Sequence, residues 1–109
     1  MKKYGFSRKE RLHLKKEFSN IIENGIKLEN EALKLYYLDN TLGFSRLGII
    51  LNRKFGKSVE RNRAKRILRE LFRLNKYNFV KNIDMIFYIK SEFKNLTEEE
   101  KKKFFLIYY

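Results

Sequence analysis

The chain has 109 residues, the size of one typical domain, and 43% of them are hydrophobic, which is enough for one core. Its 26 Lys and Arg against 13 Asp and Glu leave a formal net charge of +13, which indicates a polyanionic partner, either nucleic acid or an anionic membrane surface. The absence of cysteine excludes disulfides and thiolate metal sites, and no signal peptide or membrane span of roughly 20 apolar residues is visible. We therefore expect a single cytoplasmic domain over residues 1–109.

The first expected element is a helix over residues 7–24. Ser7 and Glu10 have the spacing of a capping box at its start, and Asn24-Gly25 is a typical helix end. Apolar residues follow one another at near-helical spacing between these two signals.

Strands are expected over residues 32–39, 46–51 and 83–89, and a strongly basic helix over residues 58–74. A last helix begins at Thr97, where three glutamates in the first turn favour the positive end of the helix dipole. Helices and strands in this order predict an α+β fold, in which helices cover a sheet as an α/β sandwich.

The basic helix has two distinct faces when its residues are placed at about 100° intervals. The apolar face, which should pack on the sheet, contains Ala64, Ile67, Leu68, Leu71 and Leu74. The other face contains Ser58, Arg61, Asn62, Lys65, Arg66, Arg69 and Arg73.

A charged helix face is most often simply solvated, but here nearly all charges have one sign. Like charges four residues apart cost a few tenths of a kcal/mol per pair, so a bound polyanion would relieve the repulsion. Asn62 can hydrogen-bond bases, sugars or phosphates, and the loop at 52–57 adds three cations before the helix. The flanking strands disfavour a membrane-bound helix, whose apolar face would stay uncovered. Nucleic-acid binding, most simply of RNA, is the preferred interpretation.

The segment from Gly56 to Glu70 resembles the signature of the bacterial ribonuclease P protein subunit. The core of the match is Arg61-Asn62-Arg63, followed by Lys65-Arg66 and Arg69-Glu70. Matching residues on both sides are Arg11-Leu12, Phe18, Gly25, Arg46-Leu47-Gly48-Ile49, Lys54 and Leu96-Thr97. The resemblance implies a small two-layer sandwich in the order α-β-β-β-α-β-α, with a left-handed β-α-β crossover around the basic helix.

The resemblance also implies a function, namely assistance in the endonucleolytic removal of the 5′ leader from precursor tRNA. The catalytic centre would lie in the partner RNA, which would also hold the Mg²⁺ that the holoenzyme requires. The protein would have no catalytic or metal-binding residues, no membrane partner, and one copy in the holoenzyme. The residues implied to bind the catalytic RNA are Lys54, Lys57, Arg61, Asn62, Arg63, Lys65, Arg66 and Arg69.

Phe18 and Tyr36 are implied to bind the single-stranded leader by stacking, which is worth about 1–3 kcal/mol per base and tolerates any sequence. Ordinary core packing is the alternative role for these two rings. Ile22 stands where the family often has an aromatic residue, which weakens stacking there.

Two other functions stay open from the residues alone. A structural RNA-binding protein of ribosomal type would share the charge and the fold class. A stand-alone protein nuclease is disfavoured, because His13 is the only histidine and because Glu98, Glu99 and Glu100 point in different directions from one helical turn.

Overall fold

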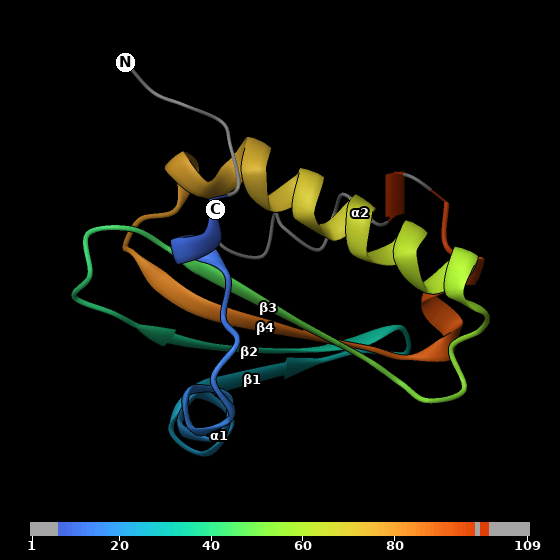
Figure 1. The fold of residues 1–109 in the computed structure, drawn as a ribbon, viewed down its shortest axis with the longest axis horizontal. Helices are drawn as coiled ribbons and strands as arrows, with labels where there is room; N and C mark the ends of the chain where they lie inside the picture. The colour runs from blue at the N-terminus through green and yellow to red at the C-terminus, as the bar shows by residue number, and fades with distance from the viewer. Residues whose placement is uncertain (1–6, 98, 101–109) are drawn as a thin grey trace.

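The fold is a four-stranded sheet with one long helix on one face and a shorter helix on the other (Figure 1). The computed structural model describes residues 7–97, 99 and 100. In chain order the elements are η1 (Arg8–Glu10), α1 (Lys15–Asn24), β1 (Ile26–Glu29), β2 (Leu33–Asp39), β3 (Arg46–Leu51), α2 (Ser58–Asn75), η2 (Lys76–Asn78), β4 (Ile83–Ile89) and η3 (Ser91–Asn95). None of the helices in this described part is long and apolar enough to cross a membrane.

Most of the expected elements are confirmed, within a residue at each end. The strands expected over 32–39, 46–51 and 83–89 are β2, β3 and β4, and the basic helix expected over 58–74 is α2. The short strand β1 has no alternating pattern of its own, because three of its four residues are exposed. Of the last helix only the start lies within the described residues.

The helix expected over residues 7–24 is wrong in its first half. Ser7 and Glu10 do interact, since the Ser7 backbone N–H donates to Glu10 Oε1 at 2.9 Å, but this closes only the single turn η1. Residues 11–14 then leave the helical path, and α1 begins at Lys15.

The extended segment at residues 11–14 lies along the free edge of β3. Arg11 forms a parallel bridge with Leu47, and the Leu12 N–H donates to the Leu47 carbonyl oxygen at 2.9 Å. Leu12 is buried while His13 is exposed, as expected of a strand with two different faces. The unpaired backbone of an edge strand therefore competes successfully with the helical hydrogen bonds that this segment could form by itself.

The sheet has the strand order β1-β2-β4-β3. The pairs β1–β2 and β2–β4 are antiparallel, whereas β3 and β4 are parallel and are joined through α2. This connection is the β-α-β crossover to which the family resemblance gives a left-handed sense. The register aligns Tyr36 with Ile86 and Ile86 with Gly48, so these three residues form one row across the sheet.

Apolar side chains form a core on each side of the sheet. The larger core lies between the sheet and α2 and includes the fully buried Leu68, Phe72, Met85 and Phe87. The smaller core, on the opposite face beneath α1, consists of Leu12, Ile21 and Ile86 with the half-buried Phe18, Tyr36, Leu38 and Ile50. The α/β sandwich is thus confirmed with α2 as its helical layer, and α1 adds a partial layer on the other face.

Candidate nucleic-acid interface

The orientation of α2 decides which of its cations face solvent. Ala64, Leu68 and Leu71 are buried as expected, but Leu74 is 48% exposed, and Phe72 is buried in its place. The buried side of the helix is therefore turned by about 50° from the expected one. The cause is the packing of Phe72 at the end of the helix, where its ring lies 6.1 Å from that of Phe79.

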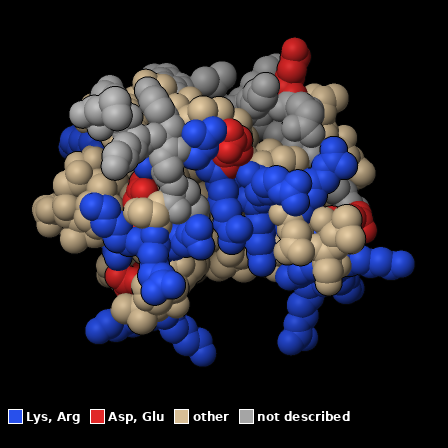
Figure 2. Space-filling model, turned by 45° about the horizontal axis from the view of Figure 1, so that its top comes forward, with Lys and Arg blue, Asp and Glu red and all other residues tan. Residues whose placement is uncertain are grey.

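This rotation divides the predicted RNA-binding residues into two groups. Arg61 and Lys65 lie next to the buried side and are half-buried, whereas Asn62, Arg63, Arg66 and Arg69 are exposed. Lys54 and Lys57, in the loop before the helix, are exposed as well. Figure 2 shows Lys and Arg side chains in a nearly continuous band across the side of the molecule that carries α2.

Arg61 has a structural role in addition to its charge. Its Nη1 donates to the Asn52 carbonyl oxygen at 3.0 Å and so attaches the loop at 52–57 to α2. Phe55, which is 1% exposed, anchors the same loop in the core. Gly56 has a φ of 151°, where a side chain would be strained and would meet the Glu60 carboxylate, so this position requires glycine. The loop therefore holds Lys54 and Lys57 at a fixed place beside the helix.

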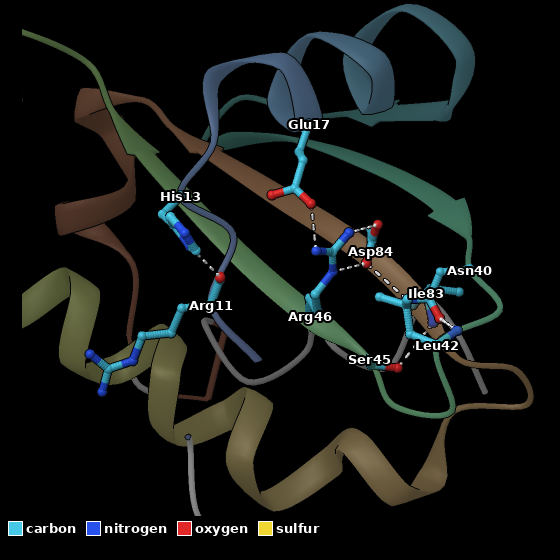
Figure 3. Close-up of polar contacts among 9 residues, drawn as sticks. All are labelled: Arg11, His13, Glu17, Asn40, Leu42, Ser45, Arg46, Ile83 and Asp84. Carbon is cyan, nitrogen blue, oxygen red and sulfur yellow. Dashed lines mark hydrogen bonds and ion pairs between the residues drawn. The ribbon is translucent and has the colours of Figure 1, made fainter. Parts of the chain in front are cut away.

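Arg11 is a functional candidate that the expected helix concealed. It lines a hollow of about 440 Å³ together with α2 residues Asn62, Arg66, Arg69, Glu70 and Arg73. In Figure 3 the Arg11 side chain extends from the segment along β3 toward α2. The local pattern of charges could not have indicated that Arg11 lies beside α2. Its position depends on the bridge between Arg11 and Leu47, which are 36 positions apart in the chain.

A second hollow, of about 210 Å³, continues from Arg11 around the free edge of β3. Its lining combines the cations of α2 with the edge strand: Arg11, Leu12, His13, Leu47, Gly48, Ile49, Lys65 and Arg69. The His13 ring is held beside it, with Nδ1 at 3.2 Å from the Arg11 carbonyl oxygen. The two hollows share Arg11 and Arg69, and the second lies where the segment at residues 11–14 borders the edge strand β3.

Phe18 and Tyr36 do come together on that opposite face. Both are half-buried and belong to the small core beneath α1. A Cβ atom on Gly48 would lie only 2.6 Å from Phe18 Cζ, so the ring packs directly on the strand backbone. One part of each side chain is thus buried against the small core, and another part is exposed to solvent. Ile22, on the same helix, is 39% exposed.

An ion-pair network fixes α1 over this face (Figure 3). Arg46 of β3 donates through Nε and Nη2 to the two oxygens of Asp84, at 2.8 and 2.7 Å, and through Nη1 to Glu17 Oε2 at 2.7 Å. Asn40 adds a hydrogen bond to Asp84 Oδ1 at 2.8 Å. Hydrogen bonding to Asp84, followed by that to Glu17, raises the pKa of the Arg46 guanidinium despite its partial burial. Because Glu17 precedes Phe18 in α1, the network sets the position of the ring.

Glu70 is the one acid among the described residues that line the first hollow beside Arg11. Its carboxylate accepts a hydrogen bond from Arg73 Nε at 3.0 Å, and this bond lowers the pKa of Glu70 and raises that of Arg73. Asn62, Arg66 and Arg69, in contrast, make no side-chain hydrogen bond or ion pair with another described residue. Their donors are therefore available to a ligand.

Thr97 and Glu100 cap the start of the last helix by hydrogen bonds in both directions. The Thr97 N–H donates to Glu100 Oε1 at 3.0 Å, and the Glu100 N–H donates to Thr97 Oγ1 at 3.2 Å. Glu98 lies outside the described residues. Among the residues that are described, no group of three or more His, Asp or Glu side chains is arranged to hold a metal ion.

Comparison with known proteins gives one consistent result. The profile of the family described as Ribonuclease P matches residues 6–107. The ribonuclease P protein component of Petrotoga mobilis is 41% identical over 80% of this chain and 74% of its own length. That of Thermotoga maritima is 43% identical over 86% of this chain and 78% of its own length. The solved structure of the Staphylococcus aureus ribonuclease P protein superposes with a TM-score of 0.80, at 26% identity, over 91% of both chains.

The agreement covers the fold as well as the sequence. The matched range contains every helix and strand described above, including α2 and the segment along β3. The chain belongs to the ribonuclease P protein family.

Proposed function

We propose that the exposed cationic face of α2 binds the catalytic RNA of ribonuclease P. As a member of its family, the chain is a protein component of this enzyme, which acts in tRNA 5′ maturation. The observation that carries the proposal is the row of solvent-facing donors Asn62, Arg66 and Arg69, joined by Arg11 in one hollow. Phosphates would replace solvent there and release condensed counterions, which favours binding. Lys54, Lys57, Arg61, Arg63 and Lys65 extend the same positive surface.

The 5′ leader of precursor tRNA would bind on the opposite face, at Phe18 and Tyr36. The hollow around the edge of β3 supports this arrangement, because its lining residues Gly48 and Leu12 are those on which Phe18 packs. A single strand leaving the α2 face could follow Arg69 and Lys65 to these rings. Half-buried rings present one surface for stacking, which suits leaders of any sequence.

The protein would act by binding and positioning, with bond cleavage at Mg²⁺ ions held by the RNA. One protein copy for each RNA, in the cytoplasm, is part of this proposal. It predicts that the RNA alone cleaves slowly at high Mg²⁺ concentration, and that the protein lowers the Mg²⁺ requirement. Leader removal by the protein in the absence of the RNA would contradict it.

The experiment is a reconstitution of the full chain with a bacterial ribonuclease P RNA and precursor tRNA at low Mg²⁺ concentration. The protein should stimulate leader removal, and Arg69→Gln should weaken assembly with the RNA. Phe18→Leu should instead reduce the preference for precursor over mature tRNA and leave assembly unchanged.

Lys27→Gln provides the matched control for charge. Lys27 lies on β1, at the sheet edge opposite β3, and pairs with Glu29 at 3.2 Å. Its loss should change neither assembly with the RNA nor the preference for precursor tRNA. Failure of the wild-type chain to stimulate cleavage would refute the proposal, and equal effects of the Lys27 and Arg69 variants would refute the α2 face as the RNA-binding surface.

A further inference from the structure

A third hollow, of about 520 Å³, lies at the far end of α2 and plays no part in the function proposed above. It is lined by Ser7, Lys9, Glu10, Gly43, Phe44, Ser45, Lys76, Tyr77 and Asn82. None of these residues lines the two hollows beside Arg11 or belongs to the small core with Phe18. Lys76 and Tyr77 follow the last residue of the 18-residue helix α2, so the hollow lies about 27 Å from the loop that precedes the helix.

Three segments distant in the sequence meet at this hollow: the turn η1 with Ser7 before it, the loop between β2 and β3, and the connection between α2 and β4. Ser45 is 4% exposed, and its Oγ accepts a hydrogen bond from the Ile83 N–H at 3.0 Å. The hollow is therefore built on fixed parts of the fold.

A buried ion pair forms part of the lining. Lys76 Nζ lies 2.6 Å from Glu10 Oε2, and the two side chains are 7% and 9% exposed. Ser7 holds the other carboxylate oxygen through its N–H and its Oγ, each at 2.9 Å. Burial acts to raise the pKa of Glu10, but the hydrogen bonds from Lys76 and Ser7 outweigh it and keep the pKa below its ordinary value. The carboxylate is thus neutralised by Lys76.

Lys9 gives the hollow a positive charge beyond that balanced pair, because Glu10 is the only acid among the lining residues that the structure describes. Its Nζ lies 4.8 Å from the centre of the Phe44 ring, so the cation and the aromatic surface are side by side. Tyr77 offers a second ring and is 44% exposed. The Asn82 side-chain amide makes no hydrogen bond to another described residue and can both donate and accept.

We propose that this hollow binds one unpaired nucleotide of RNA, with the base against the Phe44 or Tyr77 ring, its edge toward Asn82, and a phosphate at Lys9. Two aromatic rings, an amide and one uncompensated cation match the three parts of a nucleotide. The volume lies within the range of sites that enclose small ligands. A peptide ligand is less suited, because the described residues that line the hollow form no apolar groove beside the rings. The enzyme would then contact RNA at both ends of α2.

The test is a titration of the isotope-labelled full chain with adenosine 5′-monophosphate and uridine 5′-monophosphate, followed by backbone amide NMR. Saturable shifts are expected at Gly43, Phe44, Tyr77 and Asn82. The double variant Phe44→Leu/Tyr77→Leu should weaken the binding roughly tenfold or more through loss of stacking. Tyr77→Phe, which keeps the ring, should bind like the wild-type chain.

Lys9→Gln is a second variant, at an exposed position where the fold is not at risk. It should weaken binding of the nucleotides and leave that of the uncharged nucleoside adenosine unchanged. Inorganic phosphate is the probe for charge alone.

Three outcomes would overturn the proposal. They are the absence of saturable shifts at these residues, equal binding by the Phe44→Leu/Tyr77→Leu variant, and shifts by inorganic phosphate as large as those by the nucleotides. The Phe18→Leu variant should show the wild-type shifts here. Nucleotide binding in this hollow and leader binding at Phe18 are therefore tested independently of each other.

Discussion

The cationic face of α2 and the aromatic face beneath α1 hold their candidate binding groups in different ways. On α2 the donors Asn62, Arg66 and Arg69 come from one helix and are exposed, without side-chain partners among the described residues. On the other face Phe18 and Tyr36 come from different elements and are half-buried. Their positions depend on the packing of α1 and on the network around Arg46.

This difference predicts two kinds of sensitivity. Binding by exposed cations is spread over many contacts, so each substitution should cost little and act through the salt dependence of binding. Binding by positioned rings depends on the fold, so a substitution that shifts α1 should remove leader recognition even when both rings are present. The predictions below test this contrast, from the largest expected effect to the smallest.

Replacement of Arg46 by Met should have the largest effect. It would leave the carboxylates of Asp84 and Glu17, which are 10% and 24% exposed, without their cation. Removing one partner of a buried ion pair typically costs about 3–5 kcal/mol, and urea unfolding would measure the loss. The folded fraction should keep its affinity for the catalytic RNA and lose its preference for precursor tRNA.

The control for Arg46 is Lys81→Met. Lys81 pairs with Asp39 at the surface, where the two side chains are 69% and 60% exposed, so its loss should be nearly neutral. A stable Arg46→Met variant with full leader preference would show that the network does not position Phe18.

The sequence was a good guide to α2 and a poor one to what surrounds it. The bounds of α2, β3 and β4 follow from local periodicity, and so does the cationic face. The first helix was wrong because Leu12 and Leu14 fit a strand as well as a helix, and only the edge of β3 decides between the two. Arg11, Arg46 and Glu17 acquire their roles from residues far along the chain, and no local pattern contains that information.

The rotation of α2 has a similar explanation. Leu74 lies at one end of the expected apolar face and Phe72 just beyond the other end, and local spacing cannot choose between them. The ring of Phe79, which follows the helix, packs against Phe72 and so selects it for the core. The half-buried state of Arg61 and Lys65 follows from that choice.

Replacement of Lys76 by Met tests the segment that connects the two faces. The pair between Lys76 and Glu10 fastens η1 to the end of α2, and η1 leads directly to Arg11. Its loss should cost about 2–3 kcal/mol at neutral pH, less than the loss of Arg46 because Ser7 still binds Glu10. Both RNA affinity and leader preference should fall, since Arg11 lies between the two faces.

The pH dependence gives this substitution a distinct signature. The folded-state pKa of Glu10 lies below its ordinary value of 4.5, so the pair stabilises the wild-type protein above that pH. This contribution is lost as the pH falls through 4.5 toward the lower folded-state pKa. The difference in stability between wild type and Lys76→Met should therefore shrink on acidification. A difference that stays constant down to pH 3 would exclude Glu10 as its source.

Replacement of Gly48 by Ala should displace Phe18 without unfolding the protein. The new Cβ would lie 2.6 Å from Phe18 Cζ and 3.2 Å from Leu12 Cβ, and the ring must move. Such overpacking costs about 1–3 kcal/mol, and here the lower end is expected because the contact is with the end of a side chain. Kinetics with precursor and mature tRNA should show reduced discrimination. Ile89→Val, in the larger core beneath α2 and in the lining of neither hollow beside Arg11, should leave discrimination intact and so serves as the control.

The smallest effects are expected for single cations of α2, and they distinguish positions along the helix. Arg66→Gln or Arg69→Gln should each reduce the slope of log affinity against log salt by about 0.7–0.9, the value for one phosphate contact. Arg63 lines neither hollow beside Arg11, and its place on the helix is about 100° from the middle of the cationic face. Arg63→Gln should therefore change the slope by less than half as much. Equal changes of slope in the Arg63→Gln and Arg66→Gln variants would mean that the RNA contacts α2 on both sides. The edge of β3 would then no longer be the favoured route from the catalytic RNA to the leader site.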